Sequence, residues 1–266
     1  MRIKRYLKLF WAFFRFSFEA ETEFRSNLIF WSFENILWMT LGITSIHLIF
    51  GQVEAIAGWS KNEVFLVLFV ASLFHDLCWT LIFRNLGAFS RLIRKGELDN
   101  ALLKPVNTRF LLSFKILEFD HYVRIALELF LIYKYTILTT GYFSFLNLLA
   151  ALFLFTCGFL IFYSIFFALT VTNIWFINLA NLIDFFHTVK DLGGKPIEIF
   201  KIKRGFLYFF SFVLPVGYIA TFPTEALMGQ IETSKIILAP ILAIFSLWAS
   251  QKFFNFALKY YSSASS

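Results

Sequence analysis

Six long apolar stretches alternate with shorter polar segments along the chain. They cover residues 28–50, 64–83, 123–141, 146–172, 207–222 and 236–258. Most reach the roughly 20 residues that a helix needs to cross a hydrocarbon core of about 30 Å. A start near Phe110 would lengthen the third stretch, and residues 175–186 would either extend the fourth or lie along the membrane surface. The pattern predicts an all-α polytopic membrane protein with six transmembrane helices, in a single transmembrane domain over residues 1–266.

Composition agrees with this assignment. Hydrophobic residues make up 59% of the 266 positions and charged residues only 15%, and the mean hydropathy is +0.72. Soluble domains are about half apolar and a quarter charged, so the composition argues against a cytosolic enzyme, a disordered chain or a disulfide framework. Cys78 and Cys157 lie inside apolar runs without a CxxC partner. They are therefore expected to be small buried hydrophobic residues.

The net charge of +7 would indicate nucleic-acid binding in a soluble protein. In a membrane protein the positions of the positive charges matter more, because cytoplasmic loops collect them. Of the 24 Lys and Arg residues, six precede the first stretch, eight lie between the second and third, five between the fourth and fifth, and two near the end. The remaining connections hold one each: Lys61, Lys134 and Lys235. The alternation predicts six spans with both termini in the cytoplasm, and no nucleic-acid partner.

Residues 1–26 do not resemble a secretory signal, because charged residues interrupt their apolar stretch. One face of a helix there would carry Lys4, Lys8, Arg15, Glu19 and Glu23. The opposite face would carry Leu7, Phe10, Trp11, Phe14 and Phe18. This pattern predicts an amphipathic helix lying in the membrane interface. A simple positively charged anchor before the first span is the alternative.

Sequence motifs for catalysis or cofactor binding are absent. The segment 193–196 (Gly-Gly-Lys-Pro) lacks the leading glycine and the hydroxyl of a phosphate-binding loop, and there is no H-E-x-x-H or G-x-S-x-G motif. The four histidines, His47, His75, His121 and His187, are far apart in the sequence. We therefore expect no catalytic residue, no metal and no cofactor in this chain. Loops of about 20 to 40 residues are too short for a nucleotide-binding domain, so energy must come from a partner or an ion gradient.

The cytoplasmic loop at residues 84–109 is the most informative polar segment. Gly96 permits a sharp turn, acids then occupy the first turn of a short helix, and Pro105 ends it. Leu98, Ala101 and Leu102 would share one face of this helix. A two-turn helix is not stable alone in water. Its leucines either dock into a groove on a soluble partner or pack against the protein's own helices, and spacing alone does not decide between these.

The strings Lys95-Gly96-Glu97-Leu98-Asp99 and Leu102-Leu103-Lys104-Pro105 resemble a signature of bacterial ATP-binding-cassette (ABC) transporter permeases of the type-2 exporter class. The similarity is closest to the branch with six spans and about 260 residues. Further segments agree with it, among them Gly58-Trp59-Ser60, Lys195-Pro196-Ile197, Leu214-Pro215-Val216 and Phe222-Pro223-Thr224-Glu225. The resemblance extends over nearly the whole chain, but only the first two strings are specific.

The resemblance implies an architecture and partners. The loop helix would be a coupling helix that docks on a cytoplasmic ABC ATPase, which would bind and hydrolyse the ATP. The docking residues would be Gly96, Glu97, Leu98, Asp99, Leu102, Leu103, Lys104 and Pro105. A second permease subunit, identical or related, would complete a path through the bacterial plasma (inner) membrane. A short re-entrant helix would follow the fifth span at residues 223–228, closed by Gly229. The basic loop at residues 184–206 departs from the class in length, and either attracts anionic lipid or makes a second ATPase contact.

Among the polar residues within the predicted spans, Glu34 and Asn35 in the first and His75 and Asp76 in the second are singled out as costly to place there. Charged residues at a span centre cost about 2.5–3.5 kcal/mol on insertion scales and usually face a cavity or the bundle interior. They are candidates for the translocation path, and interhelical hydrogen bonding is the alternative. Arg124 and Glu128, four residues apart, are interpreted as a local ion pair.

The leading functional hypothesis is the permease subunit of an ABC exporter, without enzymatic activity of its own. The alternative is an ion-coupled secondary transporter that uses Asp76 and His75 as a relay. An intramembrane enzyme is a third class, but the scattered histidines offer no clustered site. The transported substrate is not readable from the residues.

Overall fold

The computed structural model describes residues 2–176, 188, 192, 195 and 216–261. Within those residues the chain is helical and has no strand, apart from one isolated bridge between Ile56 and Trp59. The helices begin and end as follows: α1 Arg2–Glu23, α2 Arg25–Ile49, α3 Lys61–Cys78, η1 Trp79–Phe83, α4 Arg84–Gly87, α5 Phe89–Arg94, α6 Glu97–Leu102, α7 Thr108–Phe114, α8 Tyr122–Thr140, α9 Phe145–Val171, η2 Thr172–Ile174, η5 Val216–Tyr218, α12 Thr221–Leu227 and α13 Thr233–Ala257.

Three described helices are long and apolar enough to cross a membrane: Lys61–Arg94, Phe145–Ile174 and Thr233–Ala257. They correspond to the second, fourth and sixth predicted spans. α2 and α8 form at the positions predicted for the first and third spans, with 25 and 19 residues. Both are interrupted by charged side chains, Glu34 in α2 and Arg124, Glu128 and Lys134 in α8. The count of six spans stays a prediction.

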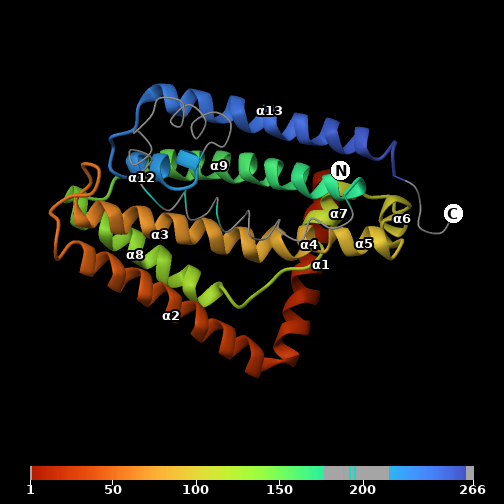
Figure 1. Ribbon diagram of the computed structural model, residues 1–266, viewed down its shortest axis with the longest axis horizontal. Coiled ribbons are helices and arrows are strands. Elements are labelled where there is room, and N and C mark those ends of the chain that lie inside the picture. The colour runs from red at the N-terminus through yellow and green to blue at the C-terminus, as the bar shows by residue number, and fades with distance from the viewer. Residues whose placement is uncertain (1, 177–187, 189–191, 193–194, 196–215, 262–266) are drawn as a thin grey trace.

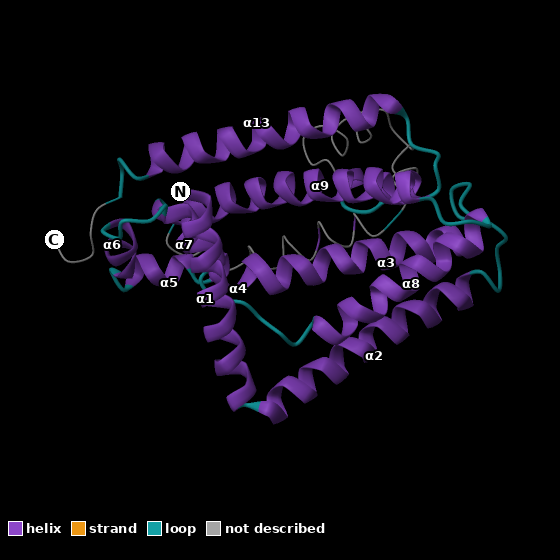
Figure 2. Ribbon diagram, turned by 180° about the vertical axis from the view of Figure 1, so that it is seen from behind, coloured by secondary structure: helices purple, strands orange, loops and turns teal. Residues whose placement is uncertain are grey.

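The long helices run side by side, whereas α1 crosses them steeply (Figure 1). α3 and α9 occupy the interior, and α13 and α2 lie on the outside, as the reverse view also shows (Figure 2). Cys78 and Cys157 are buried with free thiols, as predicted. The start of α1, the end of α13 and α6 lie at one end of the molecule, and α12 lies at the other (Figure 1).

The second predicted span is part of a continuous helical rod, Lys61–Arg94. At 1.5 Å per residue its 34 residues extend about 50 Å, so the rod is longer than a bilayer core is thick. The capping box of Ser60 and Glu63 starts it, and a π-helical turn, Trp79–Phe83, interrupts its regular winding. The rod therefore carries the short helix α6 at its far end.

The predicted amphipathic helix at the N-terminus forms as α1, and part of its apolar face packs on the protein. The rings of Phe14 and Phe18 lie 5.1 and 5.4 Å from that of Phe119. Leu7 and Trp11 stay exposed. One helix thus offers apolar side chains both to its own chain and to its surroundings.

The third span does not begin near Phe110. Phe110 belongs to the separate helix α7, and a non-helical linker, residues 115–121, separates α7 from α8. The carbonyl and the amide of Ile116 both form hydrogen bonds with the side chain of Asn85, which ties the linker to α4. Residues 177–187 and most of the basic loop at 184–206 lie outside the described residues.

A buried helical turn and a short helix occupy the end opposite α6. The predicted fifth span cannot be one helix to Phe222, because η5 ends at Tyr218 and α12 begins at Thr221; its residues 207–215 lie outside the described part. α12 coincides with the short helix predicted at residues 223–228, and Gly229 follows with φ +72°. Gly158 allows η5 to approach α9, since a Cβ there would lie 2.2 Å from the Tyr218 carbonyl oxygen.

Candidate functional site

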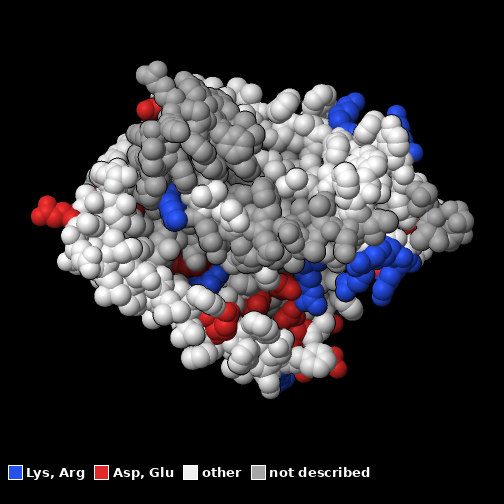
Figure 3. Space-filling view, in the orientation of Figure 1, with Lys and Arg blue, Asp and Glu red and all other residues white. Residues whose placement is uncertain are grey.

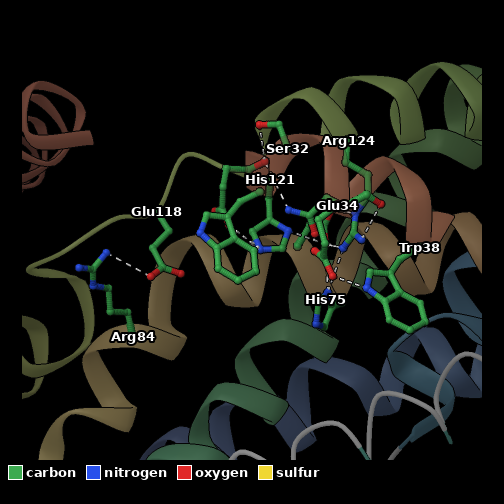
Figure 4. A network of polar contacts seen from close by, with 12 residues as sticks. Ser32, Glu34, Trp38, His75, Arg84, Glu118, His121 and Arg124 are labelled. Carbon is green, nitrogen blue, oxygen red and sulfur yellow. Dashed lines mark hydrogen bonds and ion pairs between the residues drawn. The ribbon is translucent and has the colours of Figure 1, made fainter. Parts of the chain in front are cut away.

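A cavity of about 790 Å³ lies between α2, α3 and the start of α8. Three indole rings, two carboxylates and two imidazoles contribute to its walls. Figure 4 shows several of these side chains converging on one space. The lining residues are Trp31, Glu34, Asn35, Trp38, Met39, Gly42, Leu68, Phe69, Ala71, Ser72, His75, Trp79, Asp120, His121, Arg124 and Lys195.

Of the four polar residues singled out within the predicted spans, three line this cavity. Glu34 and Asn35 reach it from α2, and His75 reaches it from α3. Glu34 accepts a hydrogen bond from the indole of Trp38, one helical turn further on. Asp76 is different: none of its surface is exposed, and it lies behind the cavity wall. The structure thus brings together residues that are 40 positions apart in the sequence.

The carboxylate of Asp76 is bound by the guanidinium of Arg124. The guanidinium donates to both carboxylate oxygens, Nε to Oδ2 at 2.5 Å and Nη2 to Oδ1. Its Nη1 donates to the backbone carbonyl of Asn35 at 3.3 Å. The contact with Glu128 is longer, 3.5 Å between Nε and Oε1. Arg124 therefore joins three helices, α2, α3 and α8, and is more than the local ion pair that its spacing from Glu128 indicates.

The two histidines adjoin the same carboxylate. Nδ1 of His75 lies 3.0 Å from Asp76 Oδ1, and Nδ1 of His121 lies 3.2 Å from it. With neutral imidazoles, the cluster would hold two carboxylates, Asp76 and Glu128, against one guanidinium. Buried charge of that kind is costly, so one proton on the cluster is needed for neutrality. Among the described residues no set of three or more metal-binding side chains is placed to hold an ion.

Backbone contacts fix the start of α8 against α2. The carbonyl oxygen of Asp120 accepts from Ser32 Oγ at 3.1 Å and from Asn35 Nδ2 at 3.5 Å. The amide of Glu118 donates to the carbonyl of Thr80, inside the π-helical turn. π-helical turns frequently occur at functional sites. Here the turn places Trp79 in the cavity wall, 5.9 Å from the ring of His121.

A second polar network lies where α1, α4 and the linker 115–121 meet. Arg84 Nη1 lies 3.2 Å from Glu118 and 3.5 Å from Glu21. Burial and the neighbouring charge of Asp120 raise the pKa of Glu118 to about 7, against a smaller lowering by Arg84. The same two causes raise the pKa of Glu21. Carboxylates gather in this region on the face seen in Figure 3.

The predicted coupling helix forms as α6, Glu97–Leu102, and Gly96 precedes it with φ +68°. Only glycine adopts this left-handed conformation readily, which explains the glycine at the turn. Of the two arrangements left open for the leucines, Leu98 adopts packing on the protein itself: its side chain is completely buried against the protein's own core. Leu103 is the exposed leucine, at 83%. The other predicted docking residues, Glu97, Asp99, Leu102, Lys104 and Pro105, range from half-buried to exposed.

The end of this loop is fastened to α1. Arg5 donates to the carbonyl of Pro105 at 3.0 Å, and the hydroxyl of Tyr6 accepts from the amide of Asn107 at 3.1 Å. Further along α1, the hydroxyl of Ser17 accepts from the amide of Leu117. The N-terminal helix is therefore bonded both to the loop that carries α6 and to the linker beside the cavity.

Sequence reasoning missed the residues that come from the linker and the π-helical turn: Asp120, His121 and Trp79. It also missed the indoles of Trp31 and Trp38. One signal was available, because an acid buried in a span requires a cation at similar depth. Arg124 is such a cation at the start of the third stretch. The other residues converge only through the fold.

Comparison with known proteins agrees with the resemblance seen in the sequence. No curated protein and no solved structure matches the chain. A family described as "ABC-2 family transporter protein" matches residues 36–265. That match begins within α2 and extends past the end of α13, so it includes the loop that carries α6 but not the cavity residues Trp31, Glu34 and Asn35. The chain therefore belongs to the ABC-2 transporter family and is an ABC-2 type permease.

Proposed function

We propose that this protein is the membrane-spanning subunit of an ABC exporter, coupled through α6 to a cytoplasmic ABC ATPase. The ATPase binds and hydrolyses ATP, and this chain has no enzymatic activity of its own. A second permease subunit, identical or related, completes the translocation path. The family match supports the class of transporter, and the tip of the Lys61–Arg94 rod supports the docking site.

The observation that carries the proposal is the position and exposure of α6. It lies at the end of a helical rod that reaches about 50 Å from the opposite face. Leu98 anchors it in the core, and Leu103 faces outward. A short helix that is anchored by one buried leucine and followed directly by an exposed one is suited to a groove on a partner. Movement of a docked ATPase would reach the cavity wall through the rod.

The proposed orientation places both termini and α6 in the cytoplasm, in six spans across the bacterial plasma membrane. The alternation of Lys and Arg supports it. So does the location of the start of α1 and the end of α13 at the same end of the molecule as α6 (Figure 1). In this orientation α1 lies at the cytoplasmic membrane surface in contact with lipid, and α12 re-enters from the outer side.

The test is association with the ATPase. The tagged permease is purified from native membranes, and co-purifying ABC ATPase is quantified by its nucleotide-binding peptides and by ATP hydrolysis. Leu103→Asp should reduce the ATPase yield at least tenfold, because a charge replaces the exposed apolar contact. Glu54→Lys, an equally exposed change in the loop at the other end, should leave the yield unchanged.

Two results would contradict the proposal. One is wild-type protein that purifies without an ABC ATPase. The other is Leu103→Asp protein that retains the ATPase at wild-type yield. Leu98 is unsuitable for this test, since its buried side chain makes any polar replacement a folding defect.

A further inference from the structure

The cavity between α2, α3 and α8 has walls of two kinds. Indole rings of Trp31, Trp38 and Trp79 supply aromatic surface, and Glu34 and Asp120 supply carboxylates. A volume of about 790 Å³ falls within the roughly 300–1,000 Å³ of sites that hold drug-sized molecules. Its chemistry therefore indicates the class of ligand that it accepts.

Charge in the walls favours a cation. The guanidinium of Arg124 is engaged by Asp76 and Glu128, both of which lie outside the lining. Lys195 is the other cationic lining residue. Glu34 and Asp120 face these, and the two carboxylates of the cluster behind the wall offset Arg124. With the one proton that the cluster requires, the four carboxylates still exceed the positive charges of Arg124, Lys195 and that proton by one.

The aromatic groups favour the same ligand. The negative face of an indole attracts an organic cation, and tryptophan is the strongest of the three aromatic residues in this respect. Glu34 links the charged wall to the aromatic wall, because its carboxylate accepts a hydrogen bond from the indole of Trp38. That bond orients the ring and leaves the second carboxylate oxygen for another partner.

We propose that this cavity binds a hydrophobic organic cation, held by the carboxylates of Glu34 and Asp120 and the indoles of Trp31, Trp38 and Trp79. The inference rests on the proposed function, in which the cavity belongs to the translocation path, and names the class of molecule that this path accepts. The lining residues of α2 and α8 lie toward the ends of these helices that are next to α1, Trp31–Gly42 on α2 and the first turn of α8.

Two probes of the same shape and opposite charge test the proposal. Tetraphenylphosphonium and tetraphenylborate are titrated separately into the full-length protein in nanodiscs of zwitterionic lipid. Binding is followed by equilibrium dialysis and by tryptophan fluorescence, after subtraction of partition into empty nanodiscs. The phosphonium should bind saturably, and the borate should show no saturable component.

Matched variants locate the site. Glu34→Gln keeps an acceptor for Trp38 but removes the charge, and should weaken phosphonium binding about tenfold. Glu54→Gln, in the loop at the other end of the rod, should leave it unchanged. Trp38→Ala should weaken binding about threefold to tenfold. Trp248→Ala, on α13 and of nearly the same exposure (58% against 60%), should not.

Equal saturable binding of both ions would overturn the proposal, as would a Glu34→Gln protein with wild-type affinity. Because the wild-type comparison of the two ions needs no variant, the result does not depend on how a substitution folds. The titration uses the permease without ATPase. Failure here therefore leaves the ATPase association untouched, and loss of that association leaves the ion binding untouched.

Discussion

Two charged networks are built on the same long helix, and they differ in what surrounds them. Asp76 pairs with Arg124 between packed helices, where both side chains are buried. Arg84 pairs with Glu118 and Glu21 where α1, α4 and the linker meet, and half of the Arg84 side chain is exposed there. Similar residues thus meet in different dielectric surroundings. The buried pair is costly to break, whereas an exposed pair contributes little.

The difference also extends to what each network joins. Arg124 bridges three helices of the bundle through a backbone carbonyl and two carboxylates. Arg84 links the N-terminal helix α1 to the linker through Glu21 and Glu118. Beside it, the uncharged side chain of Asn85 donates a hydrogen bond to the carbonyl of Ile116. We infer that the first network sets the packing of the cavity wall, and that the second sets how α1 and the linker move with the rod.

The largest effect is expected from Asp76→Asn. It leaves Arg124 buried without its bidentate partner, and should lower the free energy of unfolding by about 3–5 kcal/mol. Unfolding in mixed detergent micelles, followed by circular dichroism, measures the loss. Glu54→Gln is the control, because its carboxylate is exposed. A loss below about 1 kcal/mol would show that the two networks do not differ as burial predicts.

Glu118→Gln should change how stability depends on pH. The pKa of Glu118 is raised to about 7 in the folded protein, so the folded state holds the extra proton between about pH 4.5 and 7. Stability that this proton provides is present at low pH and is lost as pH rises through 7, by at most about 3 kcal/mol. In the Glu118→Gln variant, the free energy of unfolding should lack the part of its decrease with rising pH that Glu118 causes. Parallel pH profiles for wild type and variant would contradict the assignment.

Asn85→Ala tests the uncharged contact beside the Arg84 network, in which the Asn85 side chain binds the backbone of the linker. It removes both bonds to the backbone of Ile116, and buried backbone groups left without partners cost about 1–3 kcal/mol. Thermal unfolding measures the cost, and proteolysis at the linker should accelerate. Asn100→Ala, at an exposed asparagine on α6, serves as the matched control. An unchanged linker would show that Asn85 does not hold it.

The smallest effect is expected from Arg84→Gln. Half of the side chain is exposed, so the ion pairs with Glu21 and Glu118 should contribute less than about 1 kcal/mol. A shift in the unfolding midpoint as large as that of Asp76→Asn would reverse the comparison between the two networks. Added salt should weaken the remaining effect, because exposed pairs are screened.

Local sequence signals determined the elements of this protein. The all-helical character, the amphipathic α1, the start of α6 after Gly96 and the short helix before Gly229 were all predictable, whereas α6 ends at Leu102 and not at Lys104 as predicted. Each depends on hydrophobic periodicity or on a residue with a special backbone conformation, which act within a few positions. Membership of the ABC-2 family was also indicated by the strings around Gly96 and Pro105.

Only the tertiary structure decided which side chains meet. The burial of Leu98 and the exposure of Leu103 depend on where α6 packs, and two adjacent leucine-bearing turns look alike in the sequence. Arg124 could be paired with Glu128 from spacing, but its bidentate partner Asp76 is 48 positions away. The linker at 115–121 breaks what hydrophobicity alone would join into one helix. Long-range pairing and breaks of this kind follow from packing, which no local pattern encodes.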